Sequence, residues 1–333
     1  MCSACSKSLA SVSSVGHWLL FSKIPEAIPI LEKNLDKVDW NFLSMNSNAI
    51  HILENNLNKI SWSFLSKNSN AYYLLKNNID KINWNFIVVN SDYRVVELIK
   101  QNIDGLVVIG GDGSFTGGVI FNKEYNFPVI GIPGTIDNDI FGTSHTLGYD
   151  TALNTAVEAI DKIRDTASSH NRLFFVEVMG RDAGFIALNA GVGAGAEEIL
   201  IPEENLGLDR LLESLIKSRK SGKSSSIVVV AEGDKSGRNV FELAKYVEDN
   251  MPEYDVRVSV LGHMQRGGSP TCFDRVLGTK MGVRAVESLM EGISGKMIGI
   301  DNGKIMLTSL KKAIKGETRI DPELIRVSKI MNI

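Results

Sequence analysis

The sequence has few cysteines, no excess of charge and no long apolar run. Its three cysteines are Cys2, Cys5 and Cys272, and no second Cys or His pair follows Cys2-x-x-Cys5 at a spacing that would complete a zinc site. We interpret that pair as part of a reduced, frayed terminus. The longest apolar runs, such as residues 227–231, have the length of a strand, which excludes a membrane-spanning helix.

The charge balance also limits the function. A formal net charge of -3 gives no electrostatic footprint for nucleic acid or an anionic membrane, so any phosphate binding must come from a local cluster of lysine and arginine. The first residues carry one lysine and a weak apolar run, which does not indicate a signal peptide. We therefore expect a cytoplasmic protein, and its 333 residues are enough for two or three domains.

The first part of the chain, residues 1–92, is a repeat array. The same residue types recur every 22 residues, as Trp18, Trp40, Trp62 and Trp84 show. Trp-x-Phe-Leu predicts one short helix in each unit and Ala-x-x-x-Leu a second, while Asn-Ser-Asn between them supplies turn and N-cap chemistry. Because one unit cannot bury its own apolar face, we expect stacked α-helical repeats.

The regular tryptophans are predicted to form the core of this stack, although they could instead line a ligand groove. The array resembles short asparagine-rich helical repeats of other proteins. That resemblance names no activity, and a protein partner for the repeats is one open role.

From about residue 100 glycine rises and short β-branched runs alternate with helical stretches. Strands are expected at 106–109, 129–132, 173–178 and 227–230, and helices at 151–164, 208–220 and 241–248. This alternation predicts an α/β fold with parallel sheets. Ligands in such folds lie beyond the carboxyl ends of the strands, so the loops there are the candidate site.

Two of these loops are rich in glycine and aspartate. In Gly110–Ser114 (GGDGS), glycines allow close approach of the backbone to a ligand, the following helix start offers free N–H groups to an anion, and Asp112 could hold Mg²⁺. In residues 133–139 (PGTIDND), Asp137 or Asp139 could accept a proton from a hydroxyl while the other helps to fix a metal. The alternative is a tight turn and helix caps.

Later loops carry cationic and glycine residues. Arg181 follows one strand, Glu232 follows another, and His263 and Arg266 lie in LGHMQRGGSP. Arginine offers forked donors and histidine one more, which suits a phosphate monoester. A lone histidine would more often be structural, but this one stands beside Arg266 and a Gly-Gly loop.

The motifs GGDGS, PGTIDND, EVMGR and LGHMQRGGSP, in this order, resemble those of the bacterial-type 6-phosphofructokinase family. The similarity runs from about Tyr93 to the C-terminus. It implies a two-lobed sandwich of parallel sheets over residues 93–333, preceded by the all-α repeats of residues 1–92. The implied lobes are about 93–148 with 261–310 (lobe 1) and about 149–260 with 311–333 (lobe 2).

The resemblance also implies a reaction, the transfer of a phosphoryl group from MgATP to the 1-hydroxyl of fructose 6-phosphate. Asp137 matches the base, Thr135 a contact to the transferring phosphate, and Arg181 a residue that stabilises charge in the transition state. Asp112 and Asp139 match positions at the Mg²⁺. The positions near the nucleotide phosphates are Gly111, Gly113 and Ser114, and those that match sugar-phosphate contacts are Arg172, Met179, Gly180, Glu232, Arg257, His263 and Arg266.

Two arginines of this set, Arg172 and Arg257, match residues that reach the sugar phosphate across a subunit boundary, which implies a homo-oligomer, a tetramer in bacterial members. Pyrophosphate-using relatives have aspartate where Gly113 stands and lysine where Gly134 stands, so ATP is the implied donor.

The chain departs from the family at its start. The family opens with a strand and a GGDxPGxN loop over the ATP phosphates, whereas residues 1–92 hold the repeats. We therefore expect an uncovered sheet edge and weak or absent kinase activity. Effector contacts are also depleted: Arg164, Glu197 and Lys223 match, but Ser221 and Ser224 stand where basic residues are usual.

Three readings follow from these features. The first is an ATP-dependent 6-phosphofructokinase, impaired or rescued by a partner subunit. The second is a non-catalytic sugar-phosphate-binding or oligomerisation protein whose repeats bind a partner, and the third is a fusion without a settled role. The intact catalytic motifs favour the first, while the absent ATP loop favours the other two.

Overall fold

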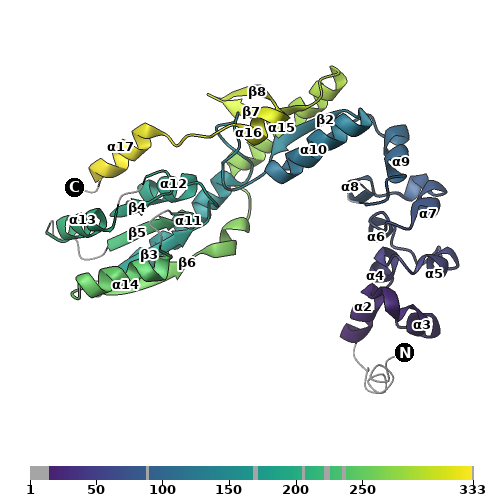
Figure 1. Cartoon of the computed structure of the whole chain (residues 1–333), viewed down its shortest axis with the longest axis horizontal. Coiled ribbons are helices and arrows are strands. Elements are labelled where there is room, and N and C mark those ends of the chain that lie inside the picture. The colour runs from purple at the N-terminus through teal and green to yellow at the C-terminus, as the bar shows by residue number, and fades with distance from the viewer. Residues whose placement is uncertain are drawn as a thin grey trace. The chain divides into compact units, whose positions relative to one another are not determined.

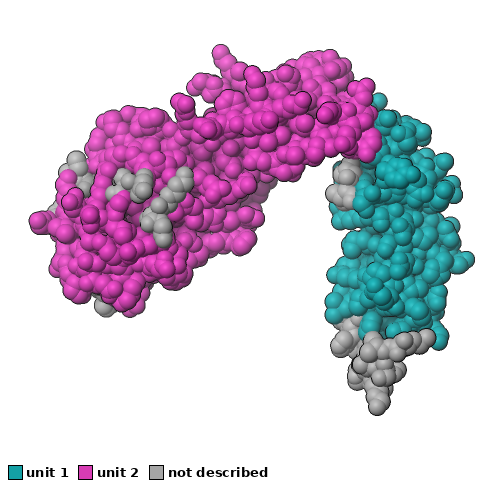
Figure 2. Space-filling view, in the orientation of Figure 1, with its two compact units in different colours: residues 1–104 teal, residues 105–333 magenta. Residues whose placement is uncertain are grey.

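The protein is described by a computed structural model that covers residues 15–87, 90–167, 172–204, 207–220, 226–234 and 238–331. The Cys2-x-x-Cys5 pair lies outside these ranges. The chain divides into two compact units, Met1–Asp104 and Gly105–Ile333 (Figure 2). Among the described residues, no helix combines the length and the apolar character needed to cross a bilayer.

The first unit is built from short helices (Figure 1). Those that begin at the repeated tryptophans are α4 (Trp40–Met45), α6 (Trp62–Leu65) and α8 (Trp84–Ile87). The other elements are α2 (Val15–Lys23), η2 (Pro25–Ala27), α3 (Ile28–Leu31), η3 (Glu32–Asn34), α5 (Ile50–Glu54), α7 (Tyr72–Lys76), η4 (Ile79–Lys81) and α9 (Val95–Asn102). The two helices predicted for each unit are thus present at α4 and α5 and again at α6 and α7.

Asparagine side chains join each repeat to the one before it. Asn68 donates from Nδ2 to the carbonyl oxygens of Ser44 and Asn46, both at 2.9 Å. Asn46 and Asn90 make the equivalent pairs of bonds one repeat earlier and one repeat later. Buried amides that are fully hydrogen-bonded fix the register between neighbouring units.

The predicted N-cap role of the Asn-Ser-Asn segment is wrong. The N-cap of α5 is Ala49 and that of α7 is Ala71, and neither helix has a side-chain cap. The Oδ1 atom of Asn68 instead accepts from the backbone N–H of Asn70 at 3.0 Å, which closes an Asx turn before the helix.

The prediction that the tryptophans form the core is also wrong. All four are only half-buried, whereas the fully buried positions are held by aliphatic side chains, Leu31, Leu43, Leu53, Leu65, Leu75 and Ile87. A lysine of the next repeat lies over each of three indole rings, for example Lys59 Nζ at 5.0 Å from the centre of the Trp40 ring. The large ring can shield a lysine stem while it stays partly in water.

The described residues of the second unit form two four-stranded sheets. The first sheet has the order β1-β2-β7-β8 and the second β4-β5-β3-β6. The strands are β1 (Leu106–Gly110), β2 (Val129–Pro133), β3 (Arg172–Val178), β4 (Glu198–Leu200), β5 (Ser226–Ala231), β6 (Asp255–Val260), β7 (Lys296–Asp301) and β8 (Lys304–Ser309). All neighbours are parallel except β7 and β8, which form an antiparallel hairpin.

Helices cover the faces of both sheets (Figure 1). On the first sheet, α10 (Asp112–Tyr125) and α16 (Leu310–Lys315) pack on one face and α15 (Cys272–Met290) on the other. On the second sheet, α11 (Tyr149–Ala167), α12 (Phe185–Gly193) and α17 (Pro322–Met331) pack on one face, and α13 (Leu208–Lys220) and α14 (Val240–Asn250) on the other. The short η5 (Gly262–Arg266) links β6 to α15.

A buried carboxylate ties α11 of the second sheet to α15 of the first. Asp274 accepts from the N–H groups of Gly148 and Thr151, each at 2.9 Å, and from the Thr151 hydroxyl. The two N–H groups lie at and just before the first turn of α11, where backbone N–H groups have no partner within the helix. The two sheets are therefore joined at the point where the chain crosses from one to the other.

Candidate active site

The predicted site residues follow the carboxyl ends of strands in both sheets. The loops after β1 and β2 touch directly, because the N–H of Gly134 donates to the carbonyl of Gly110 at 3.0 Å. A Cβ atom at Gly134 would lie only 3.0 Å from Ile109 Cγ2 and 3.4 Å from the nitrogen of Gly110. This close approach gives Gly134 a packing reason to be glycine.

One arginine and two aspartates from three separate loops lie close together. Nη1 of Arg181, after β3, lies 3.6 Å from Oδ2 of Asp112 and 3.8 Å from Oδ2 of Asp139. Burial, and then the nearby carboxylates of Asp137 and Asp112, raise the pKa of Asp139. The two carboxylates thus converge on a single position that favours a cation.

Asp137 stands in the same cluster. Its Oδ1 atom is buried and has no hydrogen-bond partner, and its backbone N–H donates to the Thr135 hydroxyl at 3.3 Å. Burial, and next the negative charge of Glu232, raise the pKa of Asp137, while Thr135, Arg266 and Arg181 act in the opposite direction. A carboxylate with an unused buried oxygen and a raised pKa is a candidate proton acceptor.

The backbone around Arg181 is held in an uncommon conformation. Its φ of 57° lies in the left-handed region, which non-glycine residues rarely adopt. Glu232 Oε1 accepts the N–H of Arg181 at 2.7 Å and that of Gly180 at 3.3 Å. A Cβ atom at Gly233 would lie 2.1 Å from the Arg181 carbonyl oxygen, so this neighbour of Glu232 leaves the space that the loop needs.

Gln265, which sequence reasoning missed, connects the two loops of the sugar-phosphate set. Its side chain is 1% exposed. Oε1 accepts the N–H of Met179 at 3.3 Å, and Nε2 donates to the Gly262 carbonyl at 3.2 Å. The neighbouring His263 and Arg266 are exposed on the same short helix. The only sequence signal was its place between these two residues.

The structure does not bring Arg172 and Arg257 to this cluster. Both pair with Asp255, Arg172 Nε at 3.2 Å and Arg257 Nη2 at 2.8 Å. Arg172 begins β3 and Arg181 follows its end, which separates them by roughly 20 Å at about 3.3 Å per residue. Arg257 lies opposite Phe174 of β3, four residues before the strand ends at Val178. Within one chain, neither arginine therefore joins the cluster around Arg181.

The residues matched to the nucleotide phosphates lie at the start of α10. Gly111 is the N-cap of this helix, and Gly113 and Ser114 are exposed in its first turn. A Cβ atom at Gly113 would meet nothing within 4 Å. Free N–H groups at a helix start that faces open space suit an anionic group.

Mg²⁺ is the metal that the sequence motifs imply for this site. The described residues contain no group of three or more His, Cys, Asp or Glu side chains placed to hold a metal. Mg²⁺ in phosphoryl-transfer sites is commonly held by one or two carboxylates together with substrate phosphates and water. The paired oxygens of Asp112 and Asp139 beside the Arg181 guanidinium fit that mode of binding.

Of the residues matched to effector contacts, Arg164 and Glu197 lie together. Nη2 of Arg164 donates to the carbonyls of Ala194 and Gly195 at 2.6 and 3.0 Å, and its Nη1 lies 3.9 Å from Glu197. Lys223, Ser221 and Ser224 lie outside the described residues.

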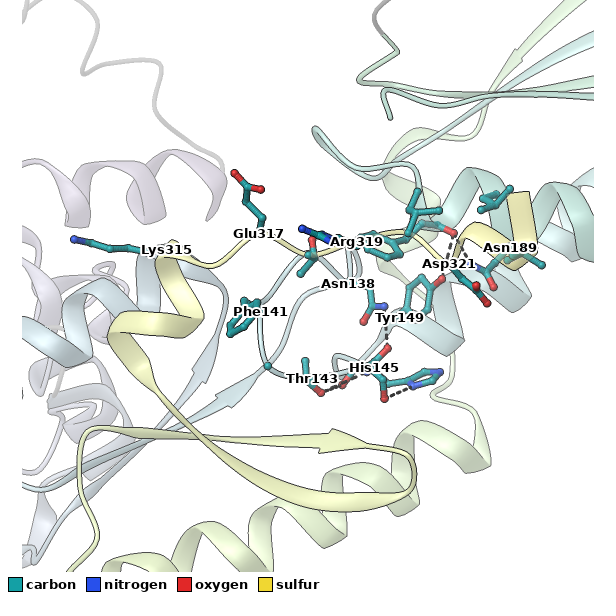
Figure 3. Close-up of a pocket in the computed structure, with 17 residues that line it drawn as sticks. Asn138, Phe141, Thr143, His145, Tyr149, Asn189, Lys315, Glu317, Arg319 and Asp321 are labelled. Carbon is teal, nitrogen blue, oxygen red and sulfur yellow. Dashed lines mark hydrogen bonds between the residues drawn. The ribbon is translucent and has the colours of Figure 1, made fainter. Parts of the chain in front are cut away.

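A cavity of about 960 Å³ lies next to the loop that carries Asp137 and Asp139. None of the predicted site residues lines it (Figure 3). Its walls come from the segment after Asn138, from α12 and from the segment before α17. Tyr149 and His145 line it, and burial lowers the pKa of His145. The PGTIDND motif reaches this cavity through Asn138, which lies between Asp137 and Asp139.

Fold, motifs and geometry define a class of protein. The profile of the phosphofructokinase family matches residues 88–289, and this chain therefore belongs to that family. It is similar to bacterial ATP-dependent members. It is 51% identical over 234 residues to ATP-dependent 6-phosphofructokinase 2 of Bacteroides thetaiotaomicron, which covers 70% of this chain and 72% of that one. It is 52% identical over 239 residues to ATP-dependent 6-phosphofructokinase of Listeria welshimeri, covering 72% and 73%.

Among solved structures, phosphofructokinase from Saccharomyces cerevisiae matches with a TM-score of 0.61 and 33% identity. The match covers 70% of this chain but only 34% of the yeast chain. The predicted α/β fold of the phosphofructokinase type and the predicted bacterial kind of relative are both confirmed.

Proposed function

We propose that this protein is an ATP-dependent 6-phosphofructokinase that transfers a phosphoryl group from MgATP to the 1-hydroxyl of fructose 6-phosphate, a step of glycolysis. The observation that carries the proposal is the convergence of Asp137, Asp112 with Asp139, and Arg181 from loops far apart in sequence. The names of the bacterial relatives support the same activity.

The chemistry needs positioning and spread positive charge more than covalent help. Asp137 accepts the proton of the sugar hydroxyl at its unpaired Oδ1 atom. Arg181 stabilises negative charge as the phosphoryl group moves, and Thr135 contacts that group. Met179, Gly180, Glu232, His263 and Arg266 bind the sugar phosphate on the loops that Gln265 and Glu232 hold together.

ATP, the phosphoryl donor, binds at the start of α10, where Gly111, Gly113 and Ser114 lie. Asp112 and Asp139 would hold Mg²⁺, which supplies charge neutralisation between the phosphates when bound. Gly113 has open space for a nucleotide phosphate, and Gly134 offers no cation of the kind found in pyrophosphate-using relatives. Both features support ATP as the donor.

The complete site is proposed to form in a homo-oligomer, a tetramer by analogy with bacterial members. Arg172 and Arg257 would then act on the sugar phosphate of a neighbouring subunit, because they lie too far from Arg181 of their own chain. The cytoplasm is the proposed location, and residues 93–333 are the proposed catalytic domain, with the repeats of residues 1–92 available to a protein partner.

Activity of this 333-residue chain alone is proposed to be weak or absent, because none of the described residues lies within 4 Å of a Cβ atom at Gly113. Loss of a single hydrogen-bond donor that is preorganised for the transition state commonly lowers the rate about a hundredfold or more. The test is ADP production by purified protein with fructose 6-phosphate and MgATP. Asp137→Asn, which removes the proton acceptor, is the control, and turnover in both proteins would contradict the proposed role of Asp137.

The same open space favours a second candidate, a protein that binds sugar phosphate without catalysis. Calorimetric titration separates the two. A kinase binds both ATP and fructose 6-phosphate, whereas a sugar-phosphate sensor binds the sugar alone. Arg266→Ala removes a side chain that donates hydrogen bonds to the sugar phosphate. It should lower the measured affinity for fructose 6-phosphate in either case, which verifies that the site is the one described.

A further inference from the structure

β1 is the outer strand of the first sheet. It pairs with β2 alone, and no described strand lies along its other edge. The N–H of Leu106 donates to Pro128 and the carbonyl of Gly110 accepts from Gly134, so these residues turn their backbone groups toward β2. By the alternation of a parallel ladder, the N–H and C=O groups of Val107 and Ile109 face the open edge.

The side chains of β1 are covered on one face only. Leu106 and Val108 pack on the core beneath α10. On the opposite face Val107 is exposed, and Ile109 is 63% exposed. Strands of parallel sheets are normally buried on both faces, so an apolar layer is missing over this half of β1.

The neighbouring helix on that face, α15, is apolar on two sides. Its sheet side buries Leu277, Met281 and Ala285. Another side, at spacings of seven, three and four residues that place it on one helix face, exposes Val276, Val283, Val286 and Met290.

α15 and β1 are adjacent, because a Cβ atom at Gly105 would lie 2.8 Å from Leu289 Cδ2. Val286 lies one helical turn before Leu289, on the same side of α15. Val107, Ile109, Val276, Val283, Val286 and Met290 are together called the β1–α15 surface. Its end at Ile109 touches the loop of Gly134 in the proposed active site.

We propose that the β1–α15 surface binds a segment of a separate, longer phosphofructokinase-family chain that supplies one β-strand and one amphipathic helix. The strand would pair with the free N–H and C=O groups of Val107 and Ile109, as in strand addition to a sheet edge. The helix would lie beside α15 and cover the exposed side chains of the same two residues. A single β–α unit of ordinary handedness can both pair with the edge of β1 and cover the exposed side chains.

A second copy of this chain satisfies only half of these requirements. Two β1 edges could exchange backbone hydrogen bonds, but each would bring the same uncovered face. The side chains of Val107 and Ile109 would then stay exposed in both copies. The occupant must therefore carry a helix of its own.

The bacterial relatives point to the source of such a segment. More than a quarter of the Bacteroides thetaiotaomicron and Listeria welshimeri chains has no counterpart in the match to this protein. That length is ample for a strand and a helix. A phosphofructokinase-family chain with this additional part is thus a partner of the right chemistry, and the inference does not depend on catalysis by either chain.

The probe is the part of the Bacteroides thetaiotaomicron relative that lies outside its match to this chain, produced with an affinity tag. Immobilised on a biosensor, it should bind the full 333-residue protein saturably with one-to-one stoichiometry. Ile109→Asp places a charge in the contact and should weaken binding at least tenfold. Phe241→Asp, an equally exposed apolar position on α14, is the matched control and should bind like the wild type.

Thermal unfolding of both variants verifies that they fold. If the tagged segment is insoluble alone, co-expression replaces mixing, and the wild-type chain but not Ile109→Asp should recover it in the soluble fraction. The proposal is overturned if the segment does not bind, or binds Ile109→Asp as well as it binds the wild type. It is also overturned by two results on the free chain. One is a dimer that Ile109→Asp abolishes, and the other is slow amide exchange at Val107 and Ile109, which would show the edge to be covered already.

Discussion

Replacing Glu232 with alanine should release the backbone of Arg181. Glu232 Oε1 accepts the Arg181 N–H at 2.7 Å and thereby holds a residue whose φ is 57°. A hydrogen bond to a charged group contributes about 1.5–3 kcal/mol, and the lower end applies because Glu232 is exposed and water can replace it. About 1.4 kcal/mol corresponds to a tenfold change in an equilibrium.

Two measurements follow from this magnitude. The Arg181 amide should exchange with solvent about tenfold faster in Glu232→Ala, and fructose 6-phosphate should bind about tenfold more weakly by calorimetry. Glu232→Gln keeps an acceptor but loses the charge, and neutral hydrogen bonds are roughly half as strong. We therefore expect about a threefold effect on both quantities for the glutamine variant.

The pKa of Asp137 gives a third readout. After burial, the negative charge of Glu232 is the largest contribution that raises this pKa. Both variants remove that charge, so the pKa of Asp137 should fall. Any rate that depends on ionised Asp137 should then keep its value to lower pH than in the wild type.

A nearby carboxylate provides the control. Glu203 accepts the N–H of Gly184 at 3.0 Å, in the same manner but outside the cluster. Glu203→Gln should leave the Arg181 amide and the sugar-phosphate affinity unchanged. Equal exchange of the Arg181 amide in Glu232→Ala and the wild type would refute the reasoning.

Three further predictions concern stability. Asp274→Ala leaves the N–H donors at the start of α11 without their buried acceptor, so it should lower the free energy of unfolding by about 3 kcal/mol, and an unchanged denaturant midpoint would contradict this role. Asn68→Ala removes two buried bonds between repeats and should destabilise the first unit by about 2 kcal/mol in urea unfolding, whereas the exposed Asn70→Ala, with one such bond, should cost clearly less. Asp137→Asn should be more stable than the wild type at pH 7, because a raised folded pKa makes ionisation costly there. The difference should vanish below about pH 4, where the carboxyl is neutral in both states, and an equal gain at both pH values would argue against the raised pKa.

Much of the fold could be predicted because its signals are local. The strands β1, β2, β3 and β5 were expected within one or two residues of their bounds, since each is a short apolar run bounded by turn residues. The short β4, the edge strand β6 and the β7–β8 hairpin were missed. Three residues are too few for a clear pattern, and the antiparallel pair is set by its partners in the sheet.

The candidate site divides in the same way. Asp112, Asp137 and Arg181 could be named because each lies in a motif directly after a strand. Gln265 and Gly233 could not, because their importance lies in a hydrogen bond to Met179 and in space for the Arg181 carbonyl. Such contacts join loops that no sequence spacing relates.

The sequence by itself determined the repeat period, the alternation of strands and helices, and the residue types available for phosphate chemistry. All three depend on neighbours within a few positions along the chain. Only the tertiary structure decided that aliphatic side chains, rather than the tryptophans, fill the core of the repeats. It also decided that Arg172 and Arg257 pair with Asp255 rather than join the cluster around Arg181. These outcomes depend on which distant segments pack together, and each segment's own pattern is compatible with several such partners.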